Sequence, residues 1–254
     1  MSNKKNNNES ISNIDNEINL KIIGHVYNDY DGKFGIPRQS GLVPEVVSHV
    51  VLRPEYQRPE AFRGLSGFSH IWLIWLFSEF WEKRAPKDEW SPTVRPPRLG
   101  GNQRVGVFAS RSPNRPNPLG LSVVRLLAVQ PNAAGEGVEL LVAGADILNG
   151  TPVLDIKPYV PYADAVPQAQ GGFAVSPEDE RARTLQVVAP PELLQKLPPE
   201  KRPALLAVLA QDPRPAYHAG RQETERVYGL SFAGFNIRFQ VQGEVLQVLA
   251  VDWL

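Results

Sequence analysis

The feature that most constrains the fold is a series of short apolar segments between residues 20 and 160, separated by loops rich in Gly and Pro. The segments contain many β-branched and aromatic residues, and no long helical pattern lies between them. Such a series favours an antiparallel sheet or barrel over a doubly wound α/β fold. The predicted strands span residues 20–27, 46–52, 67–77, 106–109, 121–129 and 138–142, followed by one from residue 153.

The composition changes after about residue 167, where a Gln- and Gly-rich stretch begins. Three short helices that start near a proline follow, and then a closing β-hairpin. We therefore predict a mainly β protein: a β-barrel-like N-terminal domain of antiparallel character and a small α+β C-terminal domain. The predicted parts are a disordered tail over 1–18, the barrel domain over 19–167 and the C-terminal domain over 173–254, with helices at 177–184, 191–197 and 203–211 and a hairpin of 227–239 with 245–251.

Several classes of site are excluded by what the chain lacks. Its 254 residues include no cysteine, so disulfides, thiolate nucleophiles and Cys-type zinc sites are absent. The four histidines lack metal-ligand spacing, and no P-loop, dinucleotide fingerprint or nucleophile elbow occurs, so we expect no metal. The longest apolar run, residues 71–77, is far shorter than the roughly 20 residues of a membrane helix. We therefore expect a cytoplasmic protein without membrane contact.

The loop within residues 105–127 is the most informative candidate site. It places Arg111, Asn114, Arg115 and Asn117 among three prolines, which hold polar side chains in place at low entropic cost. Between residues 91 and 125 the chain carries arginines without any Asp or Glu, which suits a phosphate-bearing partner. The alternative is that these arginines brace the turn or pair with carboxylates elsewhere. The six arginines are Arg95, Arg98, Arg104, Arg111, Arg115 and Arg125.

Two further polar segments are candidates. Residues 144–152, GADILNGTP, form a Gly-containing turn whose backbone groups suit an adenine edge or an amino acid moiety; an ordinary hairpin turn is the alternative. Residues 212–218, DPRPAYH, carry Asp212, Arg214 and Tyr217, which two prolines hold in place. The alternative is a helix stop with an internal Asp–Arg pair.

Several of these segments together resemble one known family. PRQSGLV, RGLSGFSHIWLIWLF, VRPPRLGGN, GVFASRSPNRPNPLGLSVVRL and GADILNGTPVLDIKPYVPYAD resemble the TrmO (TsaA/YaeB) family of S-adenosylmethionine-dependent tRNA methyltransferases. QDPRPAY is similar to the signature of the C-terminal domain in bacterial members. The resemblance implies a barrel-like fold, a homodimer with the cofactor near the protomer interface, and methylation of N6 of threonylcarbamoyladenosine beside the anticodon of a threonine tRNA.

The resemblance also implies site residues. The C-terminal motif would lie on the substrate side, and Asn149 stands where an Asp is common in the family, which preserves an acceptor oxygen and removes the charge. Cofactor contacts are expected from Pro37, Arg38, Gln39, Ser78, Glu79, Arg111, Leu121 and the turn Asp146, Ile147, Leu148 and Asn149.

The expected chemistry agrees with these residue types. A sulfonium donor carries its own leaving group and needs no metal, so the protein supplies proximity and alignment. The accepting nitrogen belongs to a urea-like group, and a base that removes its proton would help; Asp155, Asp212 and Tyr217 are the candidates, in no order. Arg115, Asn117 and Arg214 are candidates for binding the anticodon loop of tRNA, including the threonyl carboxylate. The alternatives are a non-catalytic RNA-binding module with this fold and a methyltransferase for another substrate.

Overall fold

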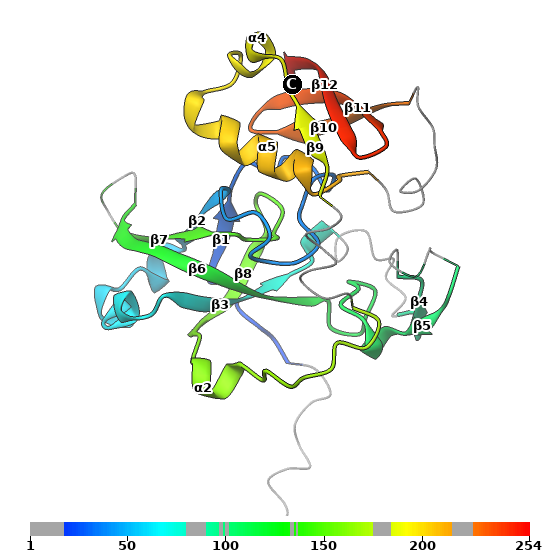
Figure 1. The fold of residues 1–254 in the computed structure, drawn as a ribbon. Helices are drawn as coiled ribbons and strands as arrows, with labels where there is room; N and C mark the ends of the chain where they lie inside the picture. The colour runs from blue at the N-terminus through cyan, green and yellow to red at the C-terminus, as the bar shows by residue number, and fades with distance from the viewer. Residues whose placement is uncertain are drawn as a thin grey trace, which may run out of the picture.

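The computed structural model describes residues 18–79, 90–96, 99, 102–132, 135, 137–174, 184–214 and 226–254. The predicted tail over 1–18 and the predicted helix over 177–184 fall almost wholly outside these residues. Within them the chain forms a closed barrel and, above it in Figure 1, a second sheet with helices beside it.

Six strands close into the barrel in the order β1-β2-β7-β6-β3-β8. Every pair of neighbours is antiparallel. The prediction of a mainly β protein with an antiparallel barrel is therefore confirmed. The strands are β1 (Gly24–Tyr27), β2 (Val47–Leu52), β3 (His70–Leu76), β6 (Leu119–Pro131), β7 (Val138–Ala143) and β8 (Pro152–Pro158).

Alternation along β3 and β6 fills the barrel. In β3 the buried residues Ile71, Leu73 and Trp75 point inward, because successive side chains of a strand face opposite sides. Gly120 of β6 lies opposite Trp75, and a Cβ at this glycine would collide with the indole ring. The pairing of β6 with β7 shifts register between Leu126 and Ala128, and a bulge of this kind bends a strand as barrel closure requires.

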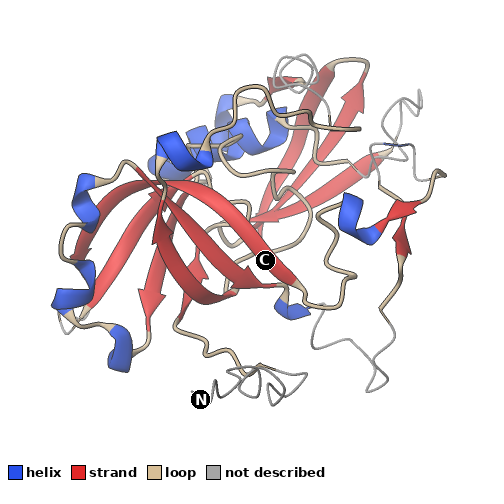
Figure 2. Cartoon of the chain, turned by 90° about the horizontal axis from the view of Figure 1, so that it is seen from below, coloured by secondary structure: helices blue, strands red, loops and turns tan. Residues whose placement is uncertain are grey.

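The predicted strand at 106–109 is mostly wrong. Only β5 (Val105–Gly106) is extended, and it pairs with β4 (Thr93–Val94) in a two-stranded sheet that stands apart from the barrel (Figures 1 and 2). Residues Val107–Ala109 form the 3-10 helix η5, because the backbone N–H and the hydroxyl of Ser110 both donate to the Val107 carbonyl. The other short helices of this half are η1 (Pro54–Tyr56), η2 (Pro59–Phe62), η3 (Leu65–Gly67) and α2 (Pro161–Asp164).

The C-terminal part is a four-stranded sheet in the order β10-β11-β12-β9. The predicted hairpin is present, but its first arm is two strands, because the chain turns at Ala233 and Gly234, both of which have positive φ. The helix α5 (Arg202–Ala210) matches the predicted helix and buries Leu205 and Val208. The remaining elements are β9 (Gln186–Val188), β10 (Val227–Phe232), β11 (Phe235–Gln242), β12 (Val245–Trp253), α4 (Pro191–Leu194) and η6 (Pro199–Lys201).

The loop between β1 and β2 joins the two parts. Its side chains Tyr30, Val43 and Val46 are buried in the hydrophobic core of the C-terminal part. Gly35 has φ +88°, and a Cβ there would meet Leu230 of β10. The loop is therefore packed against the C-terminal part, and it carries Pro37, Arg38 and Gln39, for which the family resemblance implies cofactor contacts.

Candidate functional site

A pocket of about 870 Å³ opens at one end of the barrel, where β3 ends and β6 begins. This volume lies within the range of small-molecule sites. The pocket brings together every predicted cofactor residue except Ile147 and Asn149, and it adds Arg115 and Asn117. Its lining residues are Lys33, Ile36, Pro37, Arg38, Gln39, Trp75, Phe77, Ser78, Glu79, Phe108, Ser110, Arg111, Pro113, Arg115, Pro116, Asn117, Leu119, Gly120, Leu121, Asp146, Leu148 and Thr151.

Aromatic rings form one wall of the pocket. Trp75 and Phe77 lie with ring centroids 4.3 Å apart at the end of β3. Gly120, on the neighbouring strand β6, has no side chain and so leaves room for the indole of Trp75. Flat apolar surfaces of this kind suit a heteroaromatic ring such as adenine.

Positively charged side chains surround the opening of the pocket. Nη1 of Arg111 donates to Oε1 of Gln39 at 2.6 Å, which joins two predicted cofactor segments. Nη1 of Arg115 donates to the Ser110 carbonyl at 3.1 Å and so braces its own loop. Nζ of Lys33 lies 2.6 Å from Oε2 of Glu79.

Asp146 supplies a carboxylate to the inner part of the pocket. Burial raises the pKa of Asp146, and a hydrogen bond from the Ser122 hydroxyl is the largest of the opposing effects. The Ser122 hydroxyl donates to Oδ1 of Asp146 at 2.6 Å. A partly buried carboxylate at a pocket wall suits a cationic group or an N–H or O–H donor of a ligand.

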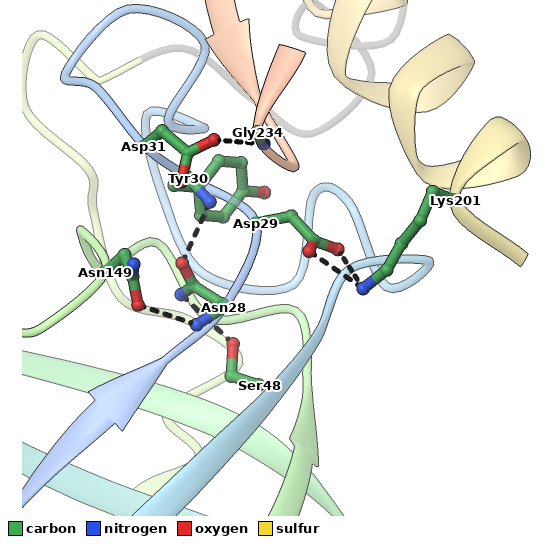
Figure 3. A network of polar contacts seen from close by, with 8 residues as sticks. All are labelled: Asn28, Asp29, Tyr30, Asp31, Ser48, Asn149, Lys201 and Gly234. Carbon is green, nitrogen blue, oxygen red and sulfur yellow. Dashed lines mark hydrogen bonds and ion pairs between the residues drawn. The ribbon is translucent and has the colours of Figure 1, made fainter. Parts of the chain in front are cut away.

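The turn after Asp146 is held from outside the pocket by Asn28 (Figure 3). The side-chain amide of Asn28 donates to the Ile147 carbonyl at 2.9 Å and to the Ser48 hydroxyl at 3.2 Å. The backbone N–H of Asn28 donates to Oδ1 of Asn149 at 3.1 Å. Ile147 itself is buried in the barrel core. Ile147 and Asn149 therefore shape the turn, and its Asp146 and Leu148 face the pocket.

The residues after Asn28 tie the same segment to the C-terminal part (Figure 3). Nζ of Lys201 lies 2.8 and 2.7 Å from the two carboxylate oxygens of Asp29. Oδ2 of Asp31 accepts a hydrogen bond from the Gly234 N–H at 2.6 Å. The segment 28–31 thus contacts the turn beside the pocket on one side and the C-terminal sheet and η6 on the other.

Of the three predicted catalytic residues, the structure describes Asp155 and Asp212. Asp155 lies on β8, half exposed, with Oδ2 3.2 Å from Nζ of Lys157, and it does not line the pocket. Asp212 follows α5 with φ +50°, and both its carboxylate oxygens accept from Arg214, at 2.7 and 2.8 Å. This hydrogen bonding raises the pKa of Arg214. Tyr217 lies outside the described residues.

Some residues of the site were not predicted from the sequence. Asn28 and Ser122 carry no motif, and each acts through a partner more than twenty positions away. Trp75 belongs both to the core of the barrel and to the pocket lining, and its pairing with Gly120 appears only in the structure. Among the described residues, no cluster of His, Cys, Asp or Glu could hold a metal ion. No helix in the described part of the chain is long and apolar enough to span a membrane.

Comparisons with known proteins agree with this arrangement. The family model of the tRNA-methyltransferase O N-terminal domain matches residues 25–165, and that of the TrmO C-terminal domain matches residues 182–253. The chain is 41% identical over 233 residues to the tRNA (adenine(37)-N6)-methyltransferase of Escherichia coli K12, covering 91% of this chain and 96% of that protein.

Two further comparisons cover a shorter relative and a solved structure. An S-adenosyl-L-methionine-binding protein of Archaeoglobus fulgidus is 36% identical over 152 residues, which is 60% of this chain and 96% of that protein. A crystal structure of TrmO from Pseudomonas aeruginosa aligns with TM-score 0.70 at 32% identity, covering 92% of this chain and 98% of that one. With its barrel, its C-terminal sheet and matches across both parts, the chain belongs to the TrmO family.

Proposed function

We propose that this chain transfers the methyl group of S-adenosylmethionine to N6 of threonylcarbamoyladenosine beside the anticodon of a threonine tRNA. The observation that carries the proposal is the pocket at the barrel end, which gathers aromatic, cationic and carboxylate side chains from distant segments. Relatives named as tRNA (adenine(37)-N6)-methyltransferases and as an S-adenosyl-L-methionine-binding protein support the reaction and the donor.

The pocket residues fit the donor by their chemistry. Trp75 and Phe77 offer apolar surface for adenine, Asp146 offers an acceptor for a cation or donor group, and Arg111 offers a partner for a carboxylate. When bound, the donor supplies an activated methyl group with its own leaving group. The chain's residues then have to hold that methyl in line with the accepting nitrogen and keep water away.

The substrate side is proposed to include the Asp212–Arg214 pair. The guanidinium binds both carboxylate oxygens of Asp212, in the planar geometry that Arg uses for carboxylates in general. A threonyl carboxylate entering this fork would displace Asp212, whose freed oxygen could then accept the N6 proton. Tyr217 stays a second candidate for that proton, and Asp155 is the weakest because it is paired with Lys157 away from the pocket. Arg115 and Asn117, at the pocket rim, are proposed tRNA contacts.

The quaternary structure and location also belong to this proposal. We propose a homodimer, because Phe108 and Leu121 of the pocket wall are 74% and 52% exposed, and apolar side chains in such positions suit a protein interface. We also propose that residues 19–167 and 173–254 form two domains. A tRNA substrate implies action in the cytoplasm.

Mass spectrometry of nucleosides is the direct test. The protein is incubated with S-adenosylmethionine and tRNA that carries threonylcarbamoyladenosine, and a gain of one methyl on that nucleoside is expected. Saturable donor binding without methyl transfer would favour the RNA-binding module, and transfer to another nucleoside would favour another substrate. Tyr217→Phe and Asp212→Asn should lower turnover and leave donor affinity nearly unchanged, which separates the substrate side from the pocket.

A further inference from the structure

Two buried side chains on neighbouring strands lead to the carboxylate of Asp146: Ser122 contacts it directly, and Trp75 contacts Ser122. Ser122 of β6 donates its hydroxyl proton to Oδ1 of Asp146 at 2.6 Å. Nε1–H of Trp75 on β3 donates to the Ser122 oxygen at 3.0 Å. Ser122 is only 1% exposed, so water does not compete for its hydroxyl. Trp75, Ser122 and Asp146 therefore form a continuous relay of hydrogen bonds that leads to the pocket.

The relay has one direction. An indole N–H can only donate, so it occupies a lone pair of the Ser122 oxygen and cannot accept the serine proton. The single hydroxyl proton of Ser122 is then directed to Asp146. A hydrogen bond given to an ionised carboxylate stabilises the charged form, and the indole donor strengthens that bond by polarising the hydroxyl.

Among the effects that lower the pKa of Asp146, the hydrogen bond from Ser122 is the largest. Burial raises the pKa of Asp146; the opposing effects, in decreasing order, are the Ser122 hydroxyl, the residue's own backbone N–H, the Arg111 guanidinium and the Ser40 backbone N–H. Tyr30 also interacts with Asp146: burial, followed by the charge of Asp146, raises the pKa of Tyr30. The other charged side chains of the pocket are Lys33, Arg38, Glu79 and Arg115.

We propose that Ser122, directed by Trp75, is a positioning residue that keeps the Asp146 carboxylate ionised and oriented to receive a cationic or hydrogen-bond-donating group of the methyl donor. For its ligand this inference rests on the proposed function. Ser122 is not itself one of the lining residues, and it acts on the pocket through Asp146. The role differs from packing, because it predicts a change in protonation and not only in stability.

The first test needs no ligand. The carboxyl ¹³C chemical shift of Asp146 is followed against pH in the unmutated protein and in Ser122→Ala. Loss of the hydroxyl removes the largest effect that opposes burial, so the titration midpoint should move to higher pH. Ser122→Thr keeps a hydroxyl and should stay near the unmutated midpoint. An unchanged midpoint in folded Ser122→Ala overturns the proposal, whether or not the protein binds S-adenosylmethionine.

Trp75→Phe is a second variant that tests the relay if the Ser122→Ala protein does not fold. It keeps an aromatic ring and the serine and removes the indole donor together with part of the ring, so the midpoint should move in the same direction by a smaller amount. Thermal unfolding of each variant confirms that a folded protein is being titrated. A folded Trp75→Phe with the unmutated midpoint would remove Trp75 from the relay.

The second test measures S-adenosylmethionine affinity by calorimetry across a range of pH. A donor that pairs with the ionised carboxylate loses affinity as pH falls through the midpoint, so the loss should begin at higher pH in Ser122→Ala. Near neutral pH we expect about tenfold weaker binding. In Asp146→Asn the pH dependence should vanish, and adding Ser122→Ala should then cost nothing further; additive losses overturn the proposal.

A comparison with a second ligand identifies the group that pairs with Asp146. With S-adenosylhomocysteine, a loss confined to the sulfonium ligand assigns the sulfonium as the partner of Asp146, and an equal loss assigns a group that both ligands share; either result supports the relay. If the unmutated protein binds neither ligand, the proposed function fails, and the ligand-free titration still decides the role of Ser122.

Discussion

The backbone N–H of Asn28 donates to Oδ1 of Asn149 across 121 positions of the chain, at 3.1 Å. This contact explains how the chain tolerates Asn where the family commonly has Asp. The amide oxygen accepts from a backbone N–H, which a carboxylate oxygen could do equally well. Asn149 does not line the pocket, so a charged side chain at this position is not required there.

Replacing Asn149 by Asp should therefore have little effect on the binding of S-adenosylmethionine. In Asn149→Asp the acceptor oxygen is kept, and we expect S-adenosylmethionine affinity within about twofold of the unmutated protein. In Asn149→Ala the Asn28 N–H loses its acceptor and the turn loosens, so affinity should fall about fivefold. Calorimetric titration of both variants tests this, and a large gain in Asn149→Asp would show that the carboxylate has a role of its own.

The pair of Lys201 and Asp29 should stabilise the contact between the two parts. Asp29 has only 14% of its side chain exposed, so Lys201→Met leaves a nearly buried carboxylate without its partner. We expect a loss of about 1–2 kcal/mol in the free energy of unfolding. Lys157→Met is the matched control: its pair with Asp155 is 62% and 51% exposed and should contribute less than about 0.5 kcal/mol. Urea denaturation measures both, and equal effects would contradict the prediction.

Gly120 should be indispensable to the shape of the pocket. In Gly120→Ala the new methyl group meets the indole of Trp75, which must move and release its hydrogen bond to Ser122. We expect a loss of about 1–3 kcal/mol in stability together with weaker donor binding. Gly106→Ala is the control: a Cβ at Gly106 meets nothing within 4 Å, so it should cause no steric loss of stability or of donor binding. Thermal unfolding and calorimetry decide the matter, and a stable Gly120→Ala with full affinity would refute the role.

Arg111 should contribute to donor affinity. Its guanidinium lines the pocket, donates to Gln39 and lowers the pKa of Asp146. Arg111→Ala should weaken S-adenosylmethionine binding about tenfold or more. Arg104→Ala removes an exposed arginine of the same cationic segment, one that donates to Thr93 and lies outside the pocket lining, and should leave donor affinity unchanged. If both variants bind alike, Arg111 has only a bracing role.

Local patterns predicted the elements whose causes are local. The aromatic and β-branched residues of β3 and the proline near the start of α5 indicated a strand and a helix where the structure has them. The 3-10 helix at Val107–Ala109 was missed because β-like residues lie there, and the Ser110 hydrogen bonds that turn the chain leave no periodic trace. The turn at Ala233 was missed because it is unusual for alanine to have positive φ.

Family-like motifs marked residues that the structure brings together, and residues placed by tertiary contacts were missed. Arg38, Arg111 and Asp146 line one pocket, and their cofactor contacts stay a prediction. Asn28 and Ser122 were not expected, because a single Asn or Ser in a strand-and-loop pattern has many possible roles. Their partners are set by the closure of the barrel, and closure brings together positions that no window of sequence contains.

The loop between β1 and β2 has a consequence for how the protein melts. Tyr30, Val43 and Val46 are each 1% exposed or less, in a core made mostly by α5 and the C-terminal strands. Detaching that core would put all three in water while the same loop still carries Pro37, Arg38 and Gln39 of the pocket. Barrel and C-terminal sheet should therefore unfold in a single cooperative transition, and the methyl-donor pocket should be lost in that same step.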